Sequence, residues 1–341
     1  MAESNPQPIP TSYAEAAQQV EAAQGKLYAN LDELPPLPWE SVQKLTGPII
    51  PGDLWVVGAR PANGKSTMML CLFDALVRRG FPTLYIGAGS EGPPADVRRQ
   101  WAAMRLGYAT DKVLEGRWDE LPEGARDKLF LELQAQADMH EVACFAEVGE
   151  KLTPELLVKS LQQFRKIKHA RYVLLDHIHR VRFGAKTDDR RGVSETTRWL
   201  RDMASKYSWG VVVAAQLHRA RSEHGPLRDL VPPVVSDLKE TGTLEEDGVV
   251  ILLLHRVKKP DVDAKTVSAV AKNERPITDI MAPQTMAVRI GKHRRRGYNN
   301  DKSAFLHVEP DGRLLDQAAM WKSPPMGQGD AYEKDSNDLP F

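Results

Sequence analysis

The sequence predicts an α/β fold in which a mostly parallel sheet is covered by helices on both faces. Short, wholly apolar runs alternate along the chain with segments of helical periodicity. Such runs are typical of strands that are buried on both faces, as in a parallel sheet with crossover helices. The expected strands are residues 54–57, 83–86, 143–148, 172–175, 211–215 and 249–254, with later strands at 286–290 and 304–308.

Helices are expected between these strands, at residues 66–79, 154–168 and 194–207. The second has Thr153 as its N-cap and Pro154 in its first turn, both of which favour a helix start. The third is expected to begin after Ser194 as N-cap, and its residues Trp199 and Met203 lie one turn apart on the face expected to point inward.

Composition divides the chain into three parts. Residues 1–38 are expected to form a disordered, proline-containing lead and a helix at 13–30, whose apolar residues recur every three or four positions. Residues 39–320 are expected to form one core domain, and residues 321–341 a flexible acidic tail. With 42% apolar residues, a chain of 341 residues can bury a core of that size.

The bulk properties exclude several classes of protein. Forty-six basic and 46 acidic residues cancel, so any nucleic-acid binding has to be local. Cys71 and Cys144 lack the spacing of a zinc site or a disulfide framework. Because no run of about 18 apolar residues and no signal peptide is present, we expect a cytoplasmic protein without membrane contact.

Residues 58–67 read Gly-Ala-Arg-Pro-Ala-Asn-Gly-Lys-Ser-Thr and lie between an expected strand and an expected helix. This context indicates a phosphate-binding loop, because backbone N–H groups and the helix dipole then face one point. Lys65 would reach the β- and γ-phosphates of ATP, and the Ser66 hydroxyl would hold Mg²⁺. One residue departs from the usual motif, because Ala59 stands where the motif has its first glycine. The alternative interpretation of residues 58–67 is an ordinary glycine-containing loop that binds no nucleotide. The expected ATP-binding residues are Arg60, Pro61, Ala62, Asn63, Gly64, Lys65, Ser66 and Thr67.

Two further strand ends carry polar side chains. Asp176 follows an apolar strand and is expected to hold Mg²⁺ through water. Gln216 ends the next strand and is expected to contact the γ-phosphate with its amide. A solvated strand end is the alternative for each. His177 and His179 have no third ligand nearby in the sequence, so we assign no zinc site to them.

Four segments, in order, resemble motifs of the DnaB-type bacterial and phage replicative helicases. They are residues 51–61 with their Gly-Ala-Arg-Pro entry, 216–219 (Gln-Leu-His-Arg), 235–256 with Ser-Asp-Leu-Lys-Glu-Thr-Gly, and 290–294 with a Lys-x-Arg element. The resemblance covers about residues 39–308 and implies a RecA-like P-loop NTPase core that uses ATP and Mg²⁺. It implies a ring-forming helicase that translocates on single-stranded DNA. The alternative is a RecA-like, DNA-dependent ATPase that acts as a recombinase, filament or loader without unwinding.

The resemblance also implies catalytic roles. In that family six RecA-like domains form a ring with ATP between neighbours. Lys292 and Arg294 would therefore reach the γ-phosphate of the adjacent subunit, where an arginine finger stabilises transition-state charge. Glu91 would be the general base, although its loop is about two residues longer than the family pattern. For Arg295 and Arg296 a solvated basic run is the alternative.

By the same resemblance, the DNA-binding residues line a central pore and grip the phosphates of single-stranded DNA without reading bases. They are Lys239, Glu240 and Gly242. A second pore loop would follow Asp176, with Arg180, Arg182 and Lys186 as its candidate cations.

The implied partners are five further copies of the chain in a homo-hexamer, single-stranded DNA, and a primase, polymerase or helicase loader. The helix at 13–30 takes the place of the linker helix that packs on a neighbouring subunit. We expect no counterpart of the primase-binding domain of cellular members, which favours a phage-like or plasmid-like form. The last residues, 335–341, resemble the acidic tip of bacterial single-stranded-DNA-binding proteins, and they would bind a replication partner or remain a solvating tail.

Overall fold

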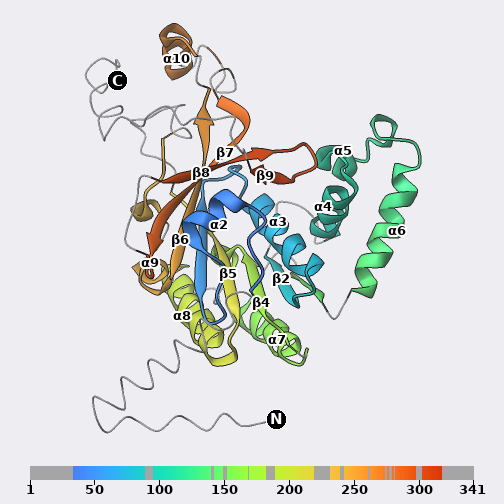
Figure 1. Cartoon of the computed structure of the whole chain (residues 1–341), viewed down its shortest axis with the longest axis vertical. Helices are drawn as coiled ribbons and strands as arrows, with labels where there is room; N and C mark the ends of the chain where they lie inside the picture. Colours follow the sequence, from blue (N-terminus) through green and yellow to red (C-terminus); the bar gives the residue numbers. More distant parts are fainter. Residues whose placement is uncertain are drawn as a thin grey trace.

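The computed structural model describes residues 34–88, 95–139, 142–148, 152–167, 169–181, 189–218, 231–238, 242–259, 262–272, 275, 279, 281–296 and 302–316. Within these ranges the chain forms one nine-stranded sheet in the order β3-β2-β4-β5-β1-β6-β7-β8-β9. Helices cover both faces of this sheet (Figure 1). The predicted α/β class is therefore confirmed.

The first six strands are parallel to one another. They are β1 (Leu54–Ala59), β2 (Thr83–Ala88), β3 (Ala143–Val148), β4 (Tyr172–Asp176), β5 (Gly210–Gln216) and β6 (Val250–Lys258). Strands β7 (Met281–His293), β8 (Ser303–Val308) and β9 (Leu314–Asp316) extend the sheet in antiparallel pairs. Every expected strand is present. Strands β6 and β7 run further than expected because their polar ends pair with each other and carry no apolar signal.

One face of the sheet carries α2 (Glu40–Thr46), α3 (Lys65–Arg78) and α4 (Ala95–Leu106). The other face carries α7 (Pro154–Arg165), α8 (Asp189–Tyr207) and α9 (Gly242–Asp247). The N-cap expected at Thr153 is confirmed, because its side chain accepts a hydrogen bond from the Leu156 N–H at 3.4 Å. Ser194 is not an N-cap, since α8 begins at Asp189, and its hydroxyl instead accepts a hydrogen bond from Thr243 at 2.9 Å.

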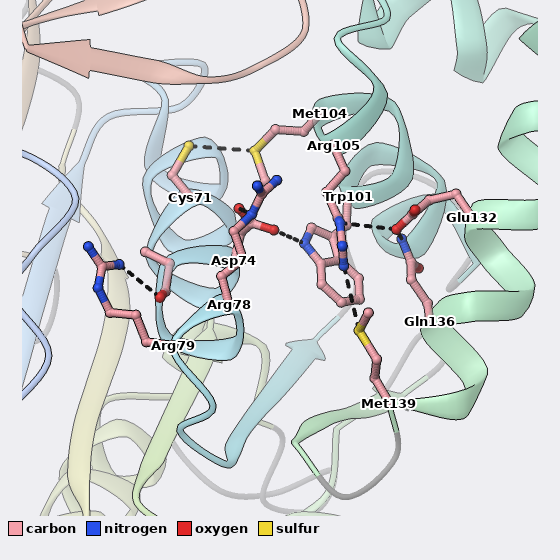
Figure 2. A network of polar contacts seen from close by, with 11 residues as sticks. Cys71, Asp74, Arg78, Arg79, Trp101, Met104, Arg105, Glu132, Gln136 and Met139 are labelled. Atoms are coloured by element: carbon pink, nitrogen blue, oxygen red, sulfur yellow. Dashed lines mark hydrogen bonds and ion pairs between the residues drawn. The ribbon is translucent and has the colours of Figure 1, made fainter.

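Helices α5 (Thr110–Glu115) and α6 (Ala125–Asp138) form a small cluster with α4, at the side of the molecule away from β6 and α9 (Figure 1). Figure 2 shows how this cluster is joined to α3. The Trp101 indole donates a hydrogen bond to Asp74 of α3 at 2.8 Å, and Arg105 pairs with Glu132 of α6 at 3.1 Å. The first contact ties the cluster to the helix that follows the phosphate loop, and the second joins α4 to α6 within the cluster.

The remaining helices of the described residues are η2 (Trp118–Glu120), η3 (Ile178–Arg180), η5 (Val235–Asp237) and α10 (Ala264–Ala271). No helix in the described parts of the chain is both long and apolar enough to cross a membrane. The predicted helix at 13–30 and the tail at 321–341 lie outside the described residues.

The basic run after β7 fastens the start of β1. Asp53 is only 3% exposed, and the guanidinium of Arg295 bonds both of its carboxylate oxygens. Arg296 donates a hydrogen bond to the Lys44 carbonyl at 2.8 Å, and the His293 ring contacts the Thr46 carbonyl at 2.9 Å. Both side chains remain exposed, as the solvated alternative has them, but each also binds the segment that leads into β1.

Replacing Arg295 with alanine should lower the free energy of unfolding by about 3 kcal/mol, because the Asp53 carboxylate then stays buried without its counter-charge. Urea unfolding followed by circular dichroism, at one protein concentration, measures the change. Arg191→Ala is the matched control, since it breaks an exposed pair with Glu195 whose contribution is small. Equal stability of the two variants would contradict a structural role for the Asp53–Arg295 pair.

Candidate functional site

The phosphate loop has the predicted strand-loop-helix context, between the end of β1 and the start of α3. Its backbone is left-handed at Ala62 (φ 59°) and Gly64 (φ 78°). A side chain at Gly64 would be strained for that reason, and its Cβ would also lie 3.0 Å from the Met286 sulfur. Asn63 fixes the loop to β6, because its amide oxygen accepts the Arg256 N–H at 3.0 Å. Three residues of the loop are exposed, namely Pro61, Ala62 and Ser66. Lys65 and Thr67 are half-buried, so all five can be reached by a ligand.

The departure from the usual loop spacing has a packing explanation. Ala59, which replaces the first glycine, is fully buried in the core on the α3 side. Gly58 faces the other side, where an added Cβ would lie 3.0–3.1 Å from Leu217, Leu238 and Leu253. The position at which a side chain would crowd its neighbours is therefore Gly58, one residue before the usual site.

Asp176 ends β4, and only one of its carboxylate oxygens has a hydrogen-bond partner among the described residues. The Tyr85 hydroxyl donates a hydrogen bond to Oδ2 at 3.0 Å, while Oδ1 is buried without a hydrogen-bond partner among the described residues. Burial, reinforced by Asp176, raises the pKa of Tyr85 well above its ordinary value, so the hydroxyl stays a donor. The unpaired carboxylate oxygen and the Ser66 hydroxyl are oxygen ligands of the kind that Mg²⁺ takes, and this ion needs few protein ligands because it keeps several waters.

Gln216 ends β5 directly beside the phosphate loop, in register with Ala59. Its backbone N–H donates a hydrogen bond to Nδ1 of His179 at 3.2 Å, so that ring nitrogen carries no proton. The Gln216 side chain remains half-exposed. His179 thus joins the turn after Asp176 to the end of β5, a contact that the sequence analysis missed.

The parallel ladder brings the three predicted groups to one edge of the sheet. Strands β4, β5 and β1 are neighbours, and the phosphate loop, Asp176 and Gln216 all follow their carboxyl ends. Because neighbouring strands lie about 4.8 Å apart, all three groups are within reach of one bound nucleotide.

Lys292 and Arg294 lie at the opposite edge. Lys292 pairs with Ile251 near the start of β6, whereas Arg256, which bonds the phosphate loop, lies near the end of that strand. About five residues of β-strand separate the two positions by about 15 Å. These cations are therefore remote from the phosphate loop of their own chain.

Lys292 and Arg294 both contact the chain around the end of α9. The ammonium of Lys292 contacts the carbonyl oxygens of Glu245 and Glu246, in the last turn of α9. Partial burial, with the charge of Arg294 beside it, lowers the pKa of Lys292. The backbone N–H of Arg294 donates a hydrogen bond to the Val249 carbonyl at 2.9 Å, and its side chain is exposed.

Several predicted site residues lie outside the described residues, so their roles stay predictions. They are Glu91, Lys239 and Glu240, together with the pore-loop candidates Arg182 and Lys186. Gly242 is described and begins α9. Arg180 lies in η3, three residues beyond His177.

The Arg60 side chain contacts a distant segment of the chain. That side chain is only 3% exposed, and one guanidinium nitrogen donates a hydrogen bond to the Val231 carbonyl at 2.8 Å. Another lies 3.7 Å from the Asp237 carboxylate. Arg60 would therefore offer its backbone to a phosphate, while its side chain contacts the segment before α9. No local pattern in the sequence indicates this contact, because its partners lie about 170 residues further along the chain.

His255 is a residue of β6 and is only 7% exposed. It lies close enough to Arg60 to feel its charge. Burial, together with the charges of Arg289 and Arg60, lowers the pKa of His255 to about 4. The imidazole is therefore neutral at physiological pH.

The strand order and the loop between β1 and α3 are those of a RecA-like P-loop fold. A sequence model of the DnaB-like helicase C terminal domain matches residues 38–307. A replicative DNA helicase DnaB of Leifsonia xyli is 26% identical over 226 residues, 65% of this chain and 46% of that protein. A probable plasmid replicative DNA helicase of Chlamydia trachomatis is 22% identical over 210 residues, 60% of this chain and 43% of that protein.

Solved structures agree in fold. One, an ATPase domain, has a TM-score of 0.66 and 18% identity, covering 90% of this chain and 99% of that chain. A DnaB-like replicative helicase, described with its interactions with primase, has a TM-score of 0.64 and 18% identity, covering 92% of this chain and 68% of that chain. The chain spans about half the length of the curated relatives it matches. It belongs to the family of DnaB-like helicase C-terminal domains.

The low pKa of His255 predicts a pH dependence of stability. Between its ordinary pKa of 6.5 and its folded value of about 4, protons bind the unfolded chain but not the folded one. Stability present above pH 6.5 should therefore be lost as the pH falls to about 4, by about 3 kcal/mol. His255→Gln should lack this part of the loss in urea unfolding, whereas His218→Gln, at an exposed position, should keep it. Parallel pH profiles for His255→Gln and the wild-type protein would contradict the assignment.

Proposed function

We propose that this chain is the ATPase motor of a ring-forming replicative DNA helicase. It would hydrolyse ATP with Mg²⁺, translocate on single-stranded DNA and unwind duplex by excluding one strand. The family assignment and the groups at the carboxyl edge of the sheet support this proposal.

One observation carries the proposal beyond ATP binding. The phosphate loop and the Lys292–Arg294 pair lie at opposite edges of the same sheet. A single protomer therefore holds one half of the proposed catalytic site on each side. If ATP binds between protomers, each completes the site of its neighbour, and repetition of that contact by rotation closes a ring.

The residues would divide the chemistry as follows. Backbone N–H groups of residues 60–67 and the ammonium of Lys65 would hold the phosphates. Ser66 and Asp176 would hold Mg²⁺, which neutralises charge that develops on the phosphate oxygens. Gln216 would hydrogen-bond the γ-phosphate or its attacking water, and Glu91 would accept a proton from that water.

Lys239, Glu240 and Gly242 would bind the phosphate backbone of single-stranded DNA. Binding would therefore not depend on the DNA sequence. Gly242 begins the helix whose last carbonyls contact Lys292. The residue proposed to reach a neighbour's ATP therefore also touches the helix next to the proposed DNA site.

The partners follow from this function. The proposed assembly is a homo-hexamer on single-stranded DNA in the cytosol, and a primase, polymerase or helicase loader would work beside it. The helix at 13–30 would pack on a neighbouring subunit, and the acidic tip at 335–341 would bind a replication partner. The proposed domain limits remain 1–38, 39–320 and 321–341.

Lys65→Ala tests the motor. The variant should lose DNA-stimulated ATP hydrolysis and unwinding of a forked duplex together, by about 100-fold or more, because the phosphates lose their cation. Lys44→Ala is the control, since Lys44 is an exposed cation on α2. Unwinding by Lys65→Ala would contradict the proposal. DNA-stimulated hydrolysis without unwinding in the wild-type protein would favour the filament or loader alternative.

Mixing variants tests whether the site is shared. Arg294→Ala and Lys65→Ala should each be inactive alone, yet mixed assemblies should recover hydrolysis. Recovery arises where Arg294→Ala supplies the phosphate loop and Lys65→Ala supplies the finger, at about a quarter of interfaces in an equal mixture. Lys65→Ala mixed with Asp176→Asn is the control, because both lesions lie on the same side of the interface. No recovery at any ratio would remove Arg294 as a finger.

A further inference from the structure

Arg60 joins the phosphate loop to a distant segment, residues 231–238. Its guanidinium contacts both ends of that segment, through the Val231 carbonyl at 2.8 Å and the Asp237 carboxylate at 3.7 Å. The Arg60 side chain is almost wholly buried, whereas that of Asp237 is 30% exposed. Because water is largely excluded around Arg60, its attraction to Asp237 is screened less than that of a surface pair.

Asp237 is held from two further directions. Its carboxylate accepts the Val234 N–H at 3.0 Å, which fixes the turn of η5. Its carbonyl accepts the N–H of His218, two residues beyond Gln216, at 2.7 Å. The next residue, Leu238, forms a bridge with Leu217, and both side chains pack over Gly58. Asp237 thus lies where the phosphate loop, the end of β5 and η5 meet.

In the sequence, Arg60 and Asp237 each lie next to one of the two proposed binding sites. Arg60 immediately precedes the residues whose backbone would enclose the phosphates. Asp237 lies two residues before Lys239, and Leu238 is followed within four residues by Gly242, at the start of α9. Arg60 and Asp237 thus connect the phosphate loop to the chain that leads to the proposed DNA-binding residues.

We propose that Arg60 and Asp237 are positioning residues that couple the nucleotide at the phosphate loop to the grip on single-stranded DNA. This inference rests on the proposed helicase function and specifies how its two sites communicate. The coupling is reciprocal, so nucleotide should change DNA affinity and DNA should change the affinity for nucleotide.

Asp237→Asn tests the inference with little change of shape. The amide oxygen can still accept the Val234 N–H, while the charge that faces Arg60 is removed. Basal hydrolysis should stay within about twofold of wild type, but its stimulation by oligo-dT should fall about tenfold. The affinity for fluorescent oligo-dT, measured by anisotropy, should no longer differ between a non-hydrolysable ATP analogue and ADP. A merely structural role would not remove that difference.

Two further variants complete the test. Asp202→Asn removes a charge from an exposed position on α8 and should leave both measurements unchanged. Arg60→Lys keeps a charge near Asp237 but loses the fork that reaches both Asp237 and Val231, and it should also weaken stimulation. If Asp237→Asn does not fold, Arg60→Lys decides, and normal stimulation in that variant overturns the inference.

Failure of the inference is distinguishable from failure of the proposed function. If the wild-type protein shows neither stimulation by DNA nor a nucleotide-dependent DNA affinity, the proposed function itself is wrong. If the wild-type protein shows both and a folded Asp237→Asn protein keeps both, only the Arg60–Asp237 coupling is overturned.

Discussion

The parallel pairing of β1 with β5 on one side and β6 on the other is the constraint on which the site depends. Parallel strands present all their carboxyl ends at one edge, so the topology alone places the phosphate loop, Asp176 and Gln216 at that edge. The antiparallel β7 then reverses direction and delivers Lys292 to the opposite edge. Sheet topology alone therefore separates the two halves of the proposed catalytic site and favours a shared site between protomers.

An arginine–aspartate pair from distant parts of the chain holds each end of β1. At its amino end Arg295 binds the buried Asp53, and at its carboxyl end Arg60 faces Asp237. The first pair is a two-pronged contact and therefore strongly directional, whereas the second is a single contact at 3.7 Å in which the buried partner is Arg60. The first pair fixes the entry to the sheet, beside the proposed finger residues. The second joins the phosphate loop to the segment before the proposed DNA site.

Local signals predicted most of the fold and the nucleotide side of the site. Apolar runs marked the strands, and the sequence around Lys65 marked a strand-loop-helix unit, because both signals lie within a few consecutive residues. The long-range contacts had no such signal: Tyr85 bonds Asp176 across 91 residues, and Asp53 and Arg295 lie 242 residues apart. The N-cap predicted at Ser194 was wrong because α8 begins earlier, at Asp189. Ser194 therefore lies inside α8, and its hydroxyl accepts a hydrogen bond from Thr243 of α9.

The central claim is that catalysis requires two protomers arranged in a closed ring. Negative-stain electron microscopy of the full chain, with a non-hydrolysable ATP analogue and single-stranded DNA, tests this claim most directly. The separation of Lys65 from Lys292 and Arg294, together with the family assignment, predicts closed rings of six subunits around a central opening. Open filaments, or particles that remain monomeric at saturating nucleotide and DNA, would contradict it.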